Sequence, residues 1–245
     1  IIPDNKFQLI HRHLRPFDHT QIDETAPLPR VFQGIEEWSD HIQAVSMQLF
    51  RPGPHLAVDE CIIRYTGNSD SITTIKGKPD PVGFKIWVIA QMGFYVKWLW
   101  HIKEDEYGDN DDALNSTQAV VVGLTKTLPK STYHVFVDNL FSSTPLFRNL
   151  RKQGYEATGT ARTNSGIHKE LVRDKNDDGK AKRMYEFNAV KVNQMAWKDN
   201  KLVLFSFTVF TGADDERVIR QKKPSSKKSE AKPIRRFFWV TKLSK

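Results

Sequence analysis

Two short apolar runs, each followed by an aspartate, constrain the fold of this chain more than any other feature. The runs lie in residues 55–61, HLAVDEC, and residues 134–140, HVFVDNL. Each is typical of a buried β-strand, and Asp59 and Asp138 stand at matching positions. A carboxylate at the end of a core strand is costly unless it is paired, caps a helix or holds a metal ion. The two together therefore indicate one site, of the kind that holds two divalent cations for phosphoryl transfer.

Taken singly, each aspartate also has a purely structural interpretation. Asp138 precedes a predicted helix, with Thr144 expected at the N-cap and Pro145 at the first helical position, so it would support that helix end. Asp59 would be a strand-end residue in contact with water. Both interpretations stay open for either residue alone, and only the pair favours a common site.

The pattern of elements predicts an α/β fold with a mixed sheet. Apolar residues at helical spacing predict a helix over 35–49, from Ile35 to Leu49, which we expect to serve packing. Further along, the expected order is strands at 56–65, 84–90 and 94–102, a helix at 116–128, a strand at 133–137, a helix at 145–152 and a strand at 155–161. A hairpin followed by two crossovers gives a mixed sheet with flanking helices, in an order that resembles the ribonuclease H-like fold. In that order the first and fourth strands are parallel neighbours, so Asp59 and Asp138 would lie side by side.

Four regions are expected along the chain. Residues 1–54 form an N-terminal helical region, residues 55–165 the ribonuclease H-like core, residues 166–212 a β-rich insertion, and residues 213–245 a basic tail. The insertion is expected to contain short antiparallel strands at 184–192, 194–198 and 202–209.

The positive charge of the chain belongs to the tail. The net charge is +8, but residues 217–245 hold eleven Lys or Arg and one Glu, so the remaining residues sum to −2. Such a tail is typical of phosphate contact or of nuclear import, and a solvated charge run is the other interpretation. The candidate DNA-binding residues in it are Lys222, Lys223, Lys227 and Lys228.

Several classes of protein are disfavoured by what these residues lack. Cys61 is the one cysteine, which excludes an internal disulfide or a cysteine-rich zinc module within the sequence. No apolar run approaches the roughly 18–20 residues of a membrane helix, so no membrane partner is expected. No phosphate-binding glycine loop, dinucleotide motif or nucleophile elbow follows any predicted strand. Because the first residue is Ile1, we expect a fragment or a processed form.

An ordered set of motifs carries a family resemblance. The most specific is residues 134–143, HVFVDNLFSS, followed by Pro145-Leu146-Phe147. The others are Val58-Asp59-Glu60 with Tyr65-Thr66-Gly67, Lys78-Pro79 leading to residues 83–88 (GFKIWV), Gly154, residues 157–162 (ATGTAR) and Trp197-Lys198-Asp199. From about Asn5 to Phe210, this order and spacing resembles the piggyBac-type transposases of the DDE superfamily.

The resemblance implies a DNA transposase that cleaves and joins phosphodiesters. Asp59 and Asp138 match the family's catalytic aspartates, which would hold two Mg²⁺ (or Mn²⁺) ions. The implied partner is double-stranded DNA, both transposon ends and target, in the nucleus, and a homodimer is left open. The cations expected to contact phosphates are Lys76, Lys78, Lys85 and Arg162, with ordinary surface charge as an equal alternative.

One departure from the family pattern leaves activity open. The family places a third catalytic Asp in a Gly-Gly-Val-Asp context, which this sequence lacks, and the late acidic residues Asp199, Asp214 and Asp215 have other surroundings. We therefore expect this chain to be incomplete or inactive alone. The alternative is a domesticated, non-catalytic DNA-binding protein, and a nuclease of the same superfamily ranks third.

Overall fold

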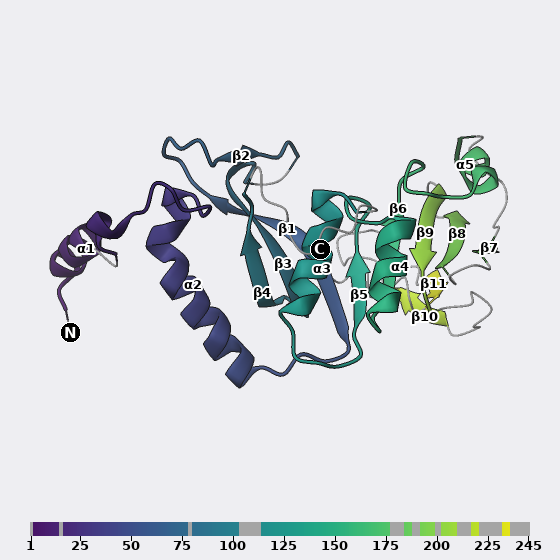
Figure 1. Ribbon diagram of the computed structural model, residues 1–245, viewed down its shortest axis with the longest axis horizontal. Helices are drawn as coiled ribbons and strands as arrows, with labels where there is room; N and C mark the ends of the chain where they lie inside the picture. Colours follow the sequence, from purple (N-terminus) through teal and green to yellow (C-terminus); the bar gives the residue numbers. More distant parts are fainter. Residues whose placement is uncertain are drawn as a thin grey trace. The chain divides into compact units, whose positions relative to one another are not determined.

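The computed structural model describes residues 2–14, 17–77, 80–102, 114–176, 184–187, 192–198, 202–209, 217–220 and 232–235 (Figure 1). The chain forms two compact units. The first combines Ile1–Phe50, Ile62–Lys85 and Trp100–Glu104, and the second combines Arg51–Cys61, Ile86–Leu99 and Asp105–Lys245. The described part contains no helix with both the length and the apolar character needed to cross a membrane.

The first unit contains the N-terminal helices. They are α1 (Asp4–His13), a 3₁₀ turn at His19–Gln21, and α2 (Arg30–Leu49). The predicted helix over 35–49 is present but begins earlier, after Pro29. Phe32 anchors it, because this fully buried ring stacks on Trp100 at 4.7 Å between centroids and meets the edge of Phe84 at 5.6 Å.

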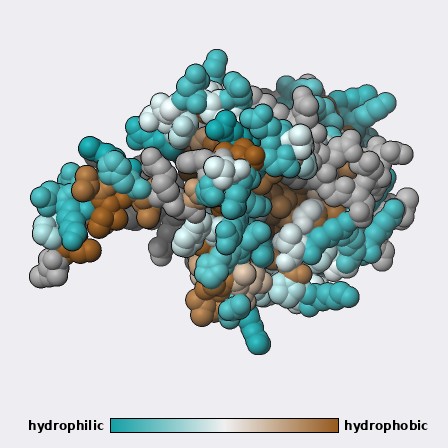
Figure 2. All heavy atoms as spheres, turned by 60° about the vertical axis from the view of Figure 1, so that its left-hand side comes forward, coloured by the Kyte–Doolittle hydropathy of each residue, from teal (hydrophilic) through white to brown (hydrophobic). Residues whose placement is uncertain are grey.

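The expectation that the apolar stripe of α2 serves packing is wrong for most of its length. Trp38 is 55% exposed and Ile35 and Ile42 are nearly as open, whereas the helix buries Phe32, Ser39 and Gln43. The buried polar pair is internally satisfied, since the Gln43 amide donates a hydrogen bond to Ser39 Oγ at 3.3 Å. Figure 2 shows brown apolar surface exposed in this N-terminal part of the chain.

One mixed sheet runs through the core. Its first strands are β1 (His55–Arg64), β2 (Thr73–Thr74), β3 (Val82–Gln91), β4 (Phe94–Trp100), β5 (His134–Val137) and β6 (Glu156–Ala161). The order is β2-β3-β1-β5-β6, with β4 also paired to β3. The predicted parallel pairing of the first and fourth strands is confirmed, because β1 pairs parallel with β5, and β5 pairs parallel with β6.

Two helices supply the crossovers of the second unit. They are α3 (Ser116–Lys126) and α4 (Thr144–Lys152), drawn in front of β5 in Figure 1. A reciprocal pair of hydrogen bonds between Asn115 and Gln118 caps the start of α3. Both helices bury apolar faces completely: Val120, Val121 and Leu124 of α3, and Leu146, Phe147 and Leu150 of α4. These residues close the core over the strands that carry the two aspartates.

The β-rich insertion continues the same sheet. It contributes α5 (Lys169–Asn176), β7 (Met184–Phe187), β8 (Val192–Lys198) and β9 (Leu202–Phe207). β9 pairs antiparallel with β6, and β8 and β7 follow outward. The antiparallel strands were predicted, but α5 was not, because it is short and carries only Leu171 and Val172 as apolar residues. Leu171 is fully buried against Ala196, Leu202 and Leu204.

Part of the predicted basic tail is folded. β10 (Arg217–Arg220) and β11 (Lys232–Arg235) pair antiparallel as a separate two-stranded sheet. The rest of the tail lies outside the described residues.

Candidate active site on two parallel strands

Asp59 and Asp138 follow paired residues of neighbouring strands. In the parallel register of β1 and β5, Val58 lies opposite Val137. Asp59 continues β1, which runs on to Arg64, so the interpretation of Asp59 as a strand-end residue is wrong, whereas Asp138 is the first residue after β5. Neighbouring strands lie about 4.8 Å apart, and residues at the same register position face the same side of a sheet. Both valines are buried and both aspartates are half-buried. The sheet thus places the two aspartates directly after paired residues of neighbouring strands.

Backbone amides orient both carboxylates. Asp59 Oδ1 accepts a hydrogen bond from the Glu60 amide at 2.8 Å, and Asp138 Oδ1 accepts one from the Leu140 amide at 2.7 Å. The turn after β5 is closed a second time, because the Ser142 hydroxyl donates to the Asp138 carbonyl at 2.9 Å. Asp138 therefore closes the turn that leads into α4, as the structural interpretation expects, and its carboxylate is held in one orientation. The structural role does not exclude the predicted metal-binding role.

The predicted start of α4 is wrong by one residue. Ser143, not Thr144, is the N-cap, because its extended backbone lets its hydroxyl accept a hydrogen bond from the Leu146 amide at 3.2 Å. Thr144 is the first helical residue and its hydroxyl donates instead to the Gly166 carbonyl at 3.0 Å. Pro145 is then the second helical residue.

Gly159 lets the turn at Asp138 approach β6 closely. It lies opposite Val137 in the register, and a Cβ added to it would lie 2.3 Å from Ser142 Oγ and 2.6 Å from the Val137 carbonyl oxygen. Any side chain there would displace the Ser142 hydroxyl that closes the turn. The sequence contains Gly159 within a motif quoted above, but this close approach has no sequence signal.

Tyr95 of β4 lies beside Asp59 and was not anticipated. Its hydroxyl donates a hydrogen bond to Cys61 Sγ at 3.3 Å. That hydrogen bond, partial burial and electrostatic interaction with Cys61 and Asp59 together raise the pKa of Tyr95 to about 12. Tyr95 therefore stays a neutral donor across the physiological range, next to one of the two aspartates.

The predicted DNA-binding cations are distributed unevenly. Arg162 is exposed directly after β6, and its guanidinium donates to Asn139 Oδ1 at 3.5 Å, next to Asp138. Lys76 is exposed in a turn and Lys85 is half-buried in β3; both belong to the first unit, whereas the aspartates belong to the second. The other predicted cations, Lys78, Lys222, Lys223, Lys227 and Lys228, lie outside the described residues.

The described residues offer two carboxylates to a metal ion, not three. Within that part of the chain, no group of three or more His, Cys, Asp or Glu side chains is arranged to hold a metal. Asp199, Asp214 and Asp215 lie outside it. Two carboxylates nevertheless fit one Mg²⁺ ion, which prefers oxygen ligands and is usually held by one or two carboxylates, water and substrate phosphates.

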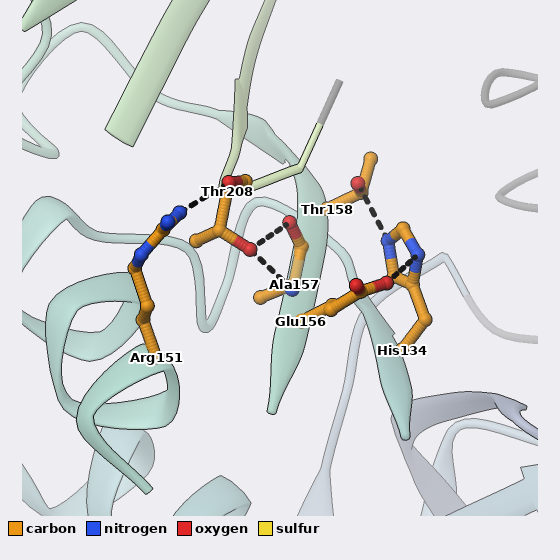
Figure 3. A network of polar contacts seen from close by, with 6 residues as sticks. All are labelled: His134, Arg151, Glu156, Ala157, Thr158 and Thr208. Carbon is orange, nitrogen blue, oxygen red and sulfur yellow. Dashed lines mark hydrogen bonds and ion pairs between the residues drawn. The ribbon is translucent and has the colours of Figure 1, made fainter. Parts of the chain in front are cut away.

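A buried polar network holds the opposite ends of the same strands (Figure 3). His134 lies opposite both His55 and Glu156 in the register and is 4% exposed. Its Nε2 lies 2.8 Å from Thr158 Oγ1 and its Nδ1 lies 3.4 Å from Glu156 Oε2. Burial, with a smaller contribution from His55, lowers the pKa of His134 to about 3. The ring is therefore neutral, and each of its nitrogens has a polar neighbour: Thr158 at Nε2 by a hydrogen bond and Glu156 at Nδ1 by a longer contact.

The same network ties β6 to the end of β9. Thr208 Oγ1 accepts a hydrogen bond from the Ala157 amide at 2.9 Å, and the Thr208 amide donates to the Ala157 carbonyl at 3.0 Å. Arg151 of α4 donates to the Thr208 carbonyl, as Figure 3 shows. These bonds join the insertion to the core at the end of the strands away from Asp138.

Comparison with known proteins identifies the family. Residues 1–239 match the family described as Transposase IS4. The chain is 26% identical over 162 residues to human PiggyBac transposable element-derived protein 2, covering 64% of this chain and 26% of that protein. It is 24% identical over 209 residues to human PiggyBac transposable element-derived protein 3, covering 81% and 34%. The chain thus spans between a quarter and about a third of the length of these curated relatives.

A solved structure supports the same fold. The chain superposes over its whole length on 49% of a chain in the cryo-EM structure of the piggyBac transposase synaptic complex with hairpin DNA, with a TM-score of 0.72 and 20% identity. The predicted mixed sheet with flanking helices, of the ribonuclease H-like kind, is therefore confirmed as the fold. The chain is thus similar to piggyBac transposable element-derived proteins and, from the family match over nearly the whole sequence, it belongs to the Transposase IS4 family.

Proposed function

We propose that this chain binds double-stranded DNA and retains the phosphodiester cleavage of a piggyBac-type transposase, although the sequence pattern predicts an incomplete or inactive site. The observation that supports the proposal is the register of β1 and β5, in which Val58 lies opposite Val137, so that Asp59 and Asp138 each follow one residue of a paired couple. DDE transposases use divalent metal ions, and we assign Asp59 and Asp138 as ligands for Mg²⁺ or Mn²⁺. A second ion would need a further ligand from beyond the described residues.

The chain's own residues have three tasks in this proposal. Asp59 and Asp138 bind the cation with carboxylates that the Glu60 and Leu140 amides hold in place. When bound there, a divalent cation supplies positive charge that stabilises the phosphodiester as its bond breaks. Arg162, next to Asn139, binds a DNA phosphate close to the site. Tyr95 stays protonated beside Asp59 and is available to donate a hydrogen bond.

Other parts of the proposal rest on charge and family. The basic residues of 217–245, including Lys222, Lys223, Lys227 and Lys228, are proposed to contact DNA phosphates and to favour nuclear import. Lys76, Lys78 and Lys85 are proposed phosphate contacts in the first unit. Assembly as a homodimer and action on transposon ends and target DNA are proposals for the longer protein, since the chain spans only part of its relatives.

The test is metal-dependent nicking of a fluorescently labelled DNA duplex. Asp59→Asn and Asp138→Asn are expected to lower the nicking rate in Mg²⁺ or Mn²⁺ by about a hundredfold or more, because each removes a charged ligand. Glu37→Gln removes the same charge from the exposed face of α2 and should leave the rate unchanged. All three variants should still bind the duplex.

Two outcomes contradict the proposed catalysis. Equal loss in Glu37→Gln would show a general charge effect. DNA binding by the wild-type chain without any metal-dependent nicking would instead support a domesticated DNA-binding protein with the Asp pair as a relic. A wild-type chain that does not bind the duplex at all would contradict both the proposed catalysis and the alternative of a DNA-binding protein.

A further inference from the structure

A buried glutamine of the insertion joins three parts of the second unit. Gln194 lies in β8 and is 1% exposed. Its Oε1 accepts a hydrogen bond from the His168 amide at 2.8 Å, and its Nε2 donates to the Gly166 carbonyl at 2.9 Å and to Thr144 Oγ1 at 3.2 Å. One side chain thus bonds to the segment after β6 and to the first residue of α4.

These bonds fix the loop 162–168, which we call the pinned loop. Thr144 reinforces them from the other side: its hydroxyl donates to the Gly166 carbonyl at 3.0 Å and its amide to the Ser165 carbonyl at 3.2 Å. Gly166 has a φ of +79°, and a Cβ there would lie 2.8 Å from Thr144 Oγ1. The loop is therefore held closely against the start of α4.

The pinned loop begins at Arg162. The Ser165 amide donates a hydrogen bond to the Arg162 carbonyl at 3.1 Å, so the backbone of Arg162 is fixed relative to the rest of the pinned loop. The Arg162 guanidinium then lies against Asn139, the residue after Asp138. These contacts lead from Gln194, which is buried, through the pinned loop to Asp138, which is half-buried. Arg162, between them, is exposed.

Packing alone does not account for Gln194. Opposite it in the register, Ser206 of β9 is equally buried, and its hydroxyl forms no hydrogen bond among the described residues. The amide of Gln194, in contrast, uses both ends of its side chain on backbone groups of the pinned loop. A buried polar group that is fully hydrogen-bonded specifies one arrangement, because any other leaves it unsatisfied.

We propose that Gln194 is a positioning residue: through the pinned loop it holds Arg162 beside the Asp138 turn, where the guanidinium contacts a DNA phosphate. The proposal rests on the proposed function, because it assigns Arg162 a phosphate contact near the Asp pair. It adds that the β-rich insertion, by way of β8, sets the geometry of the DNA-contacting surface of the core.

The experiment measures binding of the 245-residue chain to a labelled 20-bp duplex of mixed sequence at several salt concentrations. Arg162→Ala should lower the slope of log affinity against log salt by about one, and the affinity at 0.1 M salt roughly fivefold to tenfold, because one phosphate contact is lost. Gln194→Met keeps the side-chain length but removes all three hydrogen bonds and should give most of the same loss. The double variant should bind the duplex no more weakly than Arg162→Ala alone, because both changes remove the same phosphate contact.

Matched variants separate positioning from stability. Ser206→Ala changes a buried polar residue beside Gln194 and should leave the salt slope unchanged. Thr144→Val should lower the slope, whereas Thr144→Ser keeps the hydroxyl and should restore it. Hydrogen exchange of the His168 amide, which donates to Gln194, should accelerate at least tenfold in Gln194→Met and remain slow in Ser206→Ala. The Thr144 pair keeps the proposal testable if Gln194→Met does not fold.

The outcomes distinguish this proposal from the proposed function. If Arg162→Ala lowers the slope and Gln194→Met and Thr144→Val do not, positioning by Gln194 is wrong while DNA binding stands. If Arg162→Ala leaves the slope unchanged, the phosphate contact and with it this proposal are wrong. If the wild-type chain does not bind the duplex, the proposed function fails, and exchange at His168 still reports whether Gln194 orders the loop.

Discussion

At the scale of single residues, His134 shows how a titratable group serves as a neutral part of the core. His134 lies opposite His55 and Glu156 in the register, and its ring stacks on Phe136 at 4.3 Å between centroids. Nε2 forms a hydrogen bond with Thr158, and Nδ1 lies 3.4 Å from the Glu156 carboxylate. A proton added at Nε2 would meet the Thr158 hydroxyl in a buried environment next to another histidine. The folded protein therefore resists protonation of this ring.

We predict that His134 makes the chain less stable in mild acid. The folded pKa is about 3 and the ordinary value is 6.5, so between these pH values the unfolded chain binds more protons. The free energy of unfolding should thus fall as pH drops below about 6.5, by up to ~1.4 kcal/mol per pH unit from this residue. His134→Gln should be less stable at pH 7 but show a shallower dependence between pH 6.5 and 4.

Urea unfolding at several pH values measures this difference. Carboxylates contribute to the pH dependence of both proteins, so the informative quantity is wild type minus variant. Parallel curves for the two proteins would mean that His134 is protonated in the folded state after all.

Residues also differ in how far the sequence could identify them. Asp59 and Asp138 were predictable because each follows an apolar run, and strand order then implied their pairing. Tyr95, Gly159 and Gln194 were not, because each acts through a contact with residues distant in the sequence: Cys61, Ser142 and Gly166. Alternation and spacing report local structure and burial, and they carry no information on which distant backbone group a side chain will bond.

At the scale of elements, the junction of β5, α4 and β6 determines where Asp138 is presented. β5 is four residues long and fully buried, so its end has little freedom. The turn that follows is closed by Ser142 and capped by Ser143, and the neighbouring strand approaches closely at Gly159. The sequence predicted all three elements, but it missed the N-cap by one residue because Ser143 and Thr144 are both good caps and only the backbone conformation decides between them.

We predict that Gly159→Ala strongly destabilises this junction. The new Cβ would overlap the Val137 carbonyl oxygen and Ser142 Oγ, and the carbonyl is fixed in the sheet, so an overpacking cost of about 1–3 kcal/mol or more is expected. Gly123→Ala in α3 is the control: its Cβ would meet only Leu99 at 3.6 Å, an ordinary contact. That change should stabilise the helix by about 0.5–1 kcal/mol.

Thermal melting of both variants tests the contrast. Metal-dependent nicking by Gly159→Ala, measured well below its melting temperature, should also be reduced because the Asp138 turn is displaced. A Gly159→Ala protein as stable as wild type would show that the strands separate easily here and that the turn is not held as described.

At the scale of the whole molecule, the insertion is an extension of the core sheet. β9 continues from β6, and β8 and β7 continue from β9, so the strands form one sheet although they belong to two regions of the sequence. The sequence predicted the antiparallel strands, but it could not show that they join β6. Strands pair where their free edges meet and their apolar faces point to the same side. Apolar and polar residues alternate too little along β6 and β9 for the sequence to reveal that these two strands pair.

We predict that deleting residues 184–209 makes the protein self-associate. The deletion would turn β6 into an open edge and uncover Ala161, Ile167 and Leu171, which pack under β8 and β9. Light scattering after size-exclusion chromatography should report aggregates or oligomers for the deletion variant at a concentration where the full chain gives its native size. Ending the chain after residue 216 removes, of the described elements, the separate β10–β11 sheet and leaves β6 paired, so it should not have this effect.

The pairing of β1 with β5 has a thermodynamic consequence as well. Asp59 and Asp138 come together only when two strands distant in the sequence lie in register, so the unfolded chain has no equivalent of their shared site. A cation held by both carboxylates binds the native state alone, and mass action then couples its concentration to folding. Each tenfold rise in free cation above its dissociation constant would add about 1.4 kcal/mol to stability, which makes a melting curve in Mg²⁺ a measure of the site independent of any DNA.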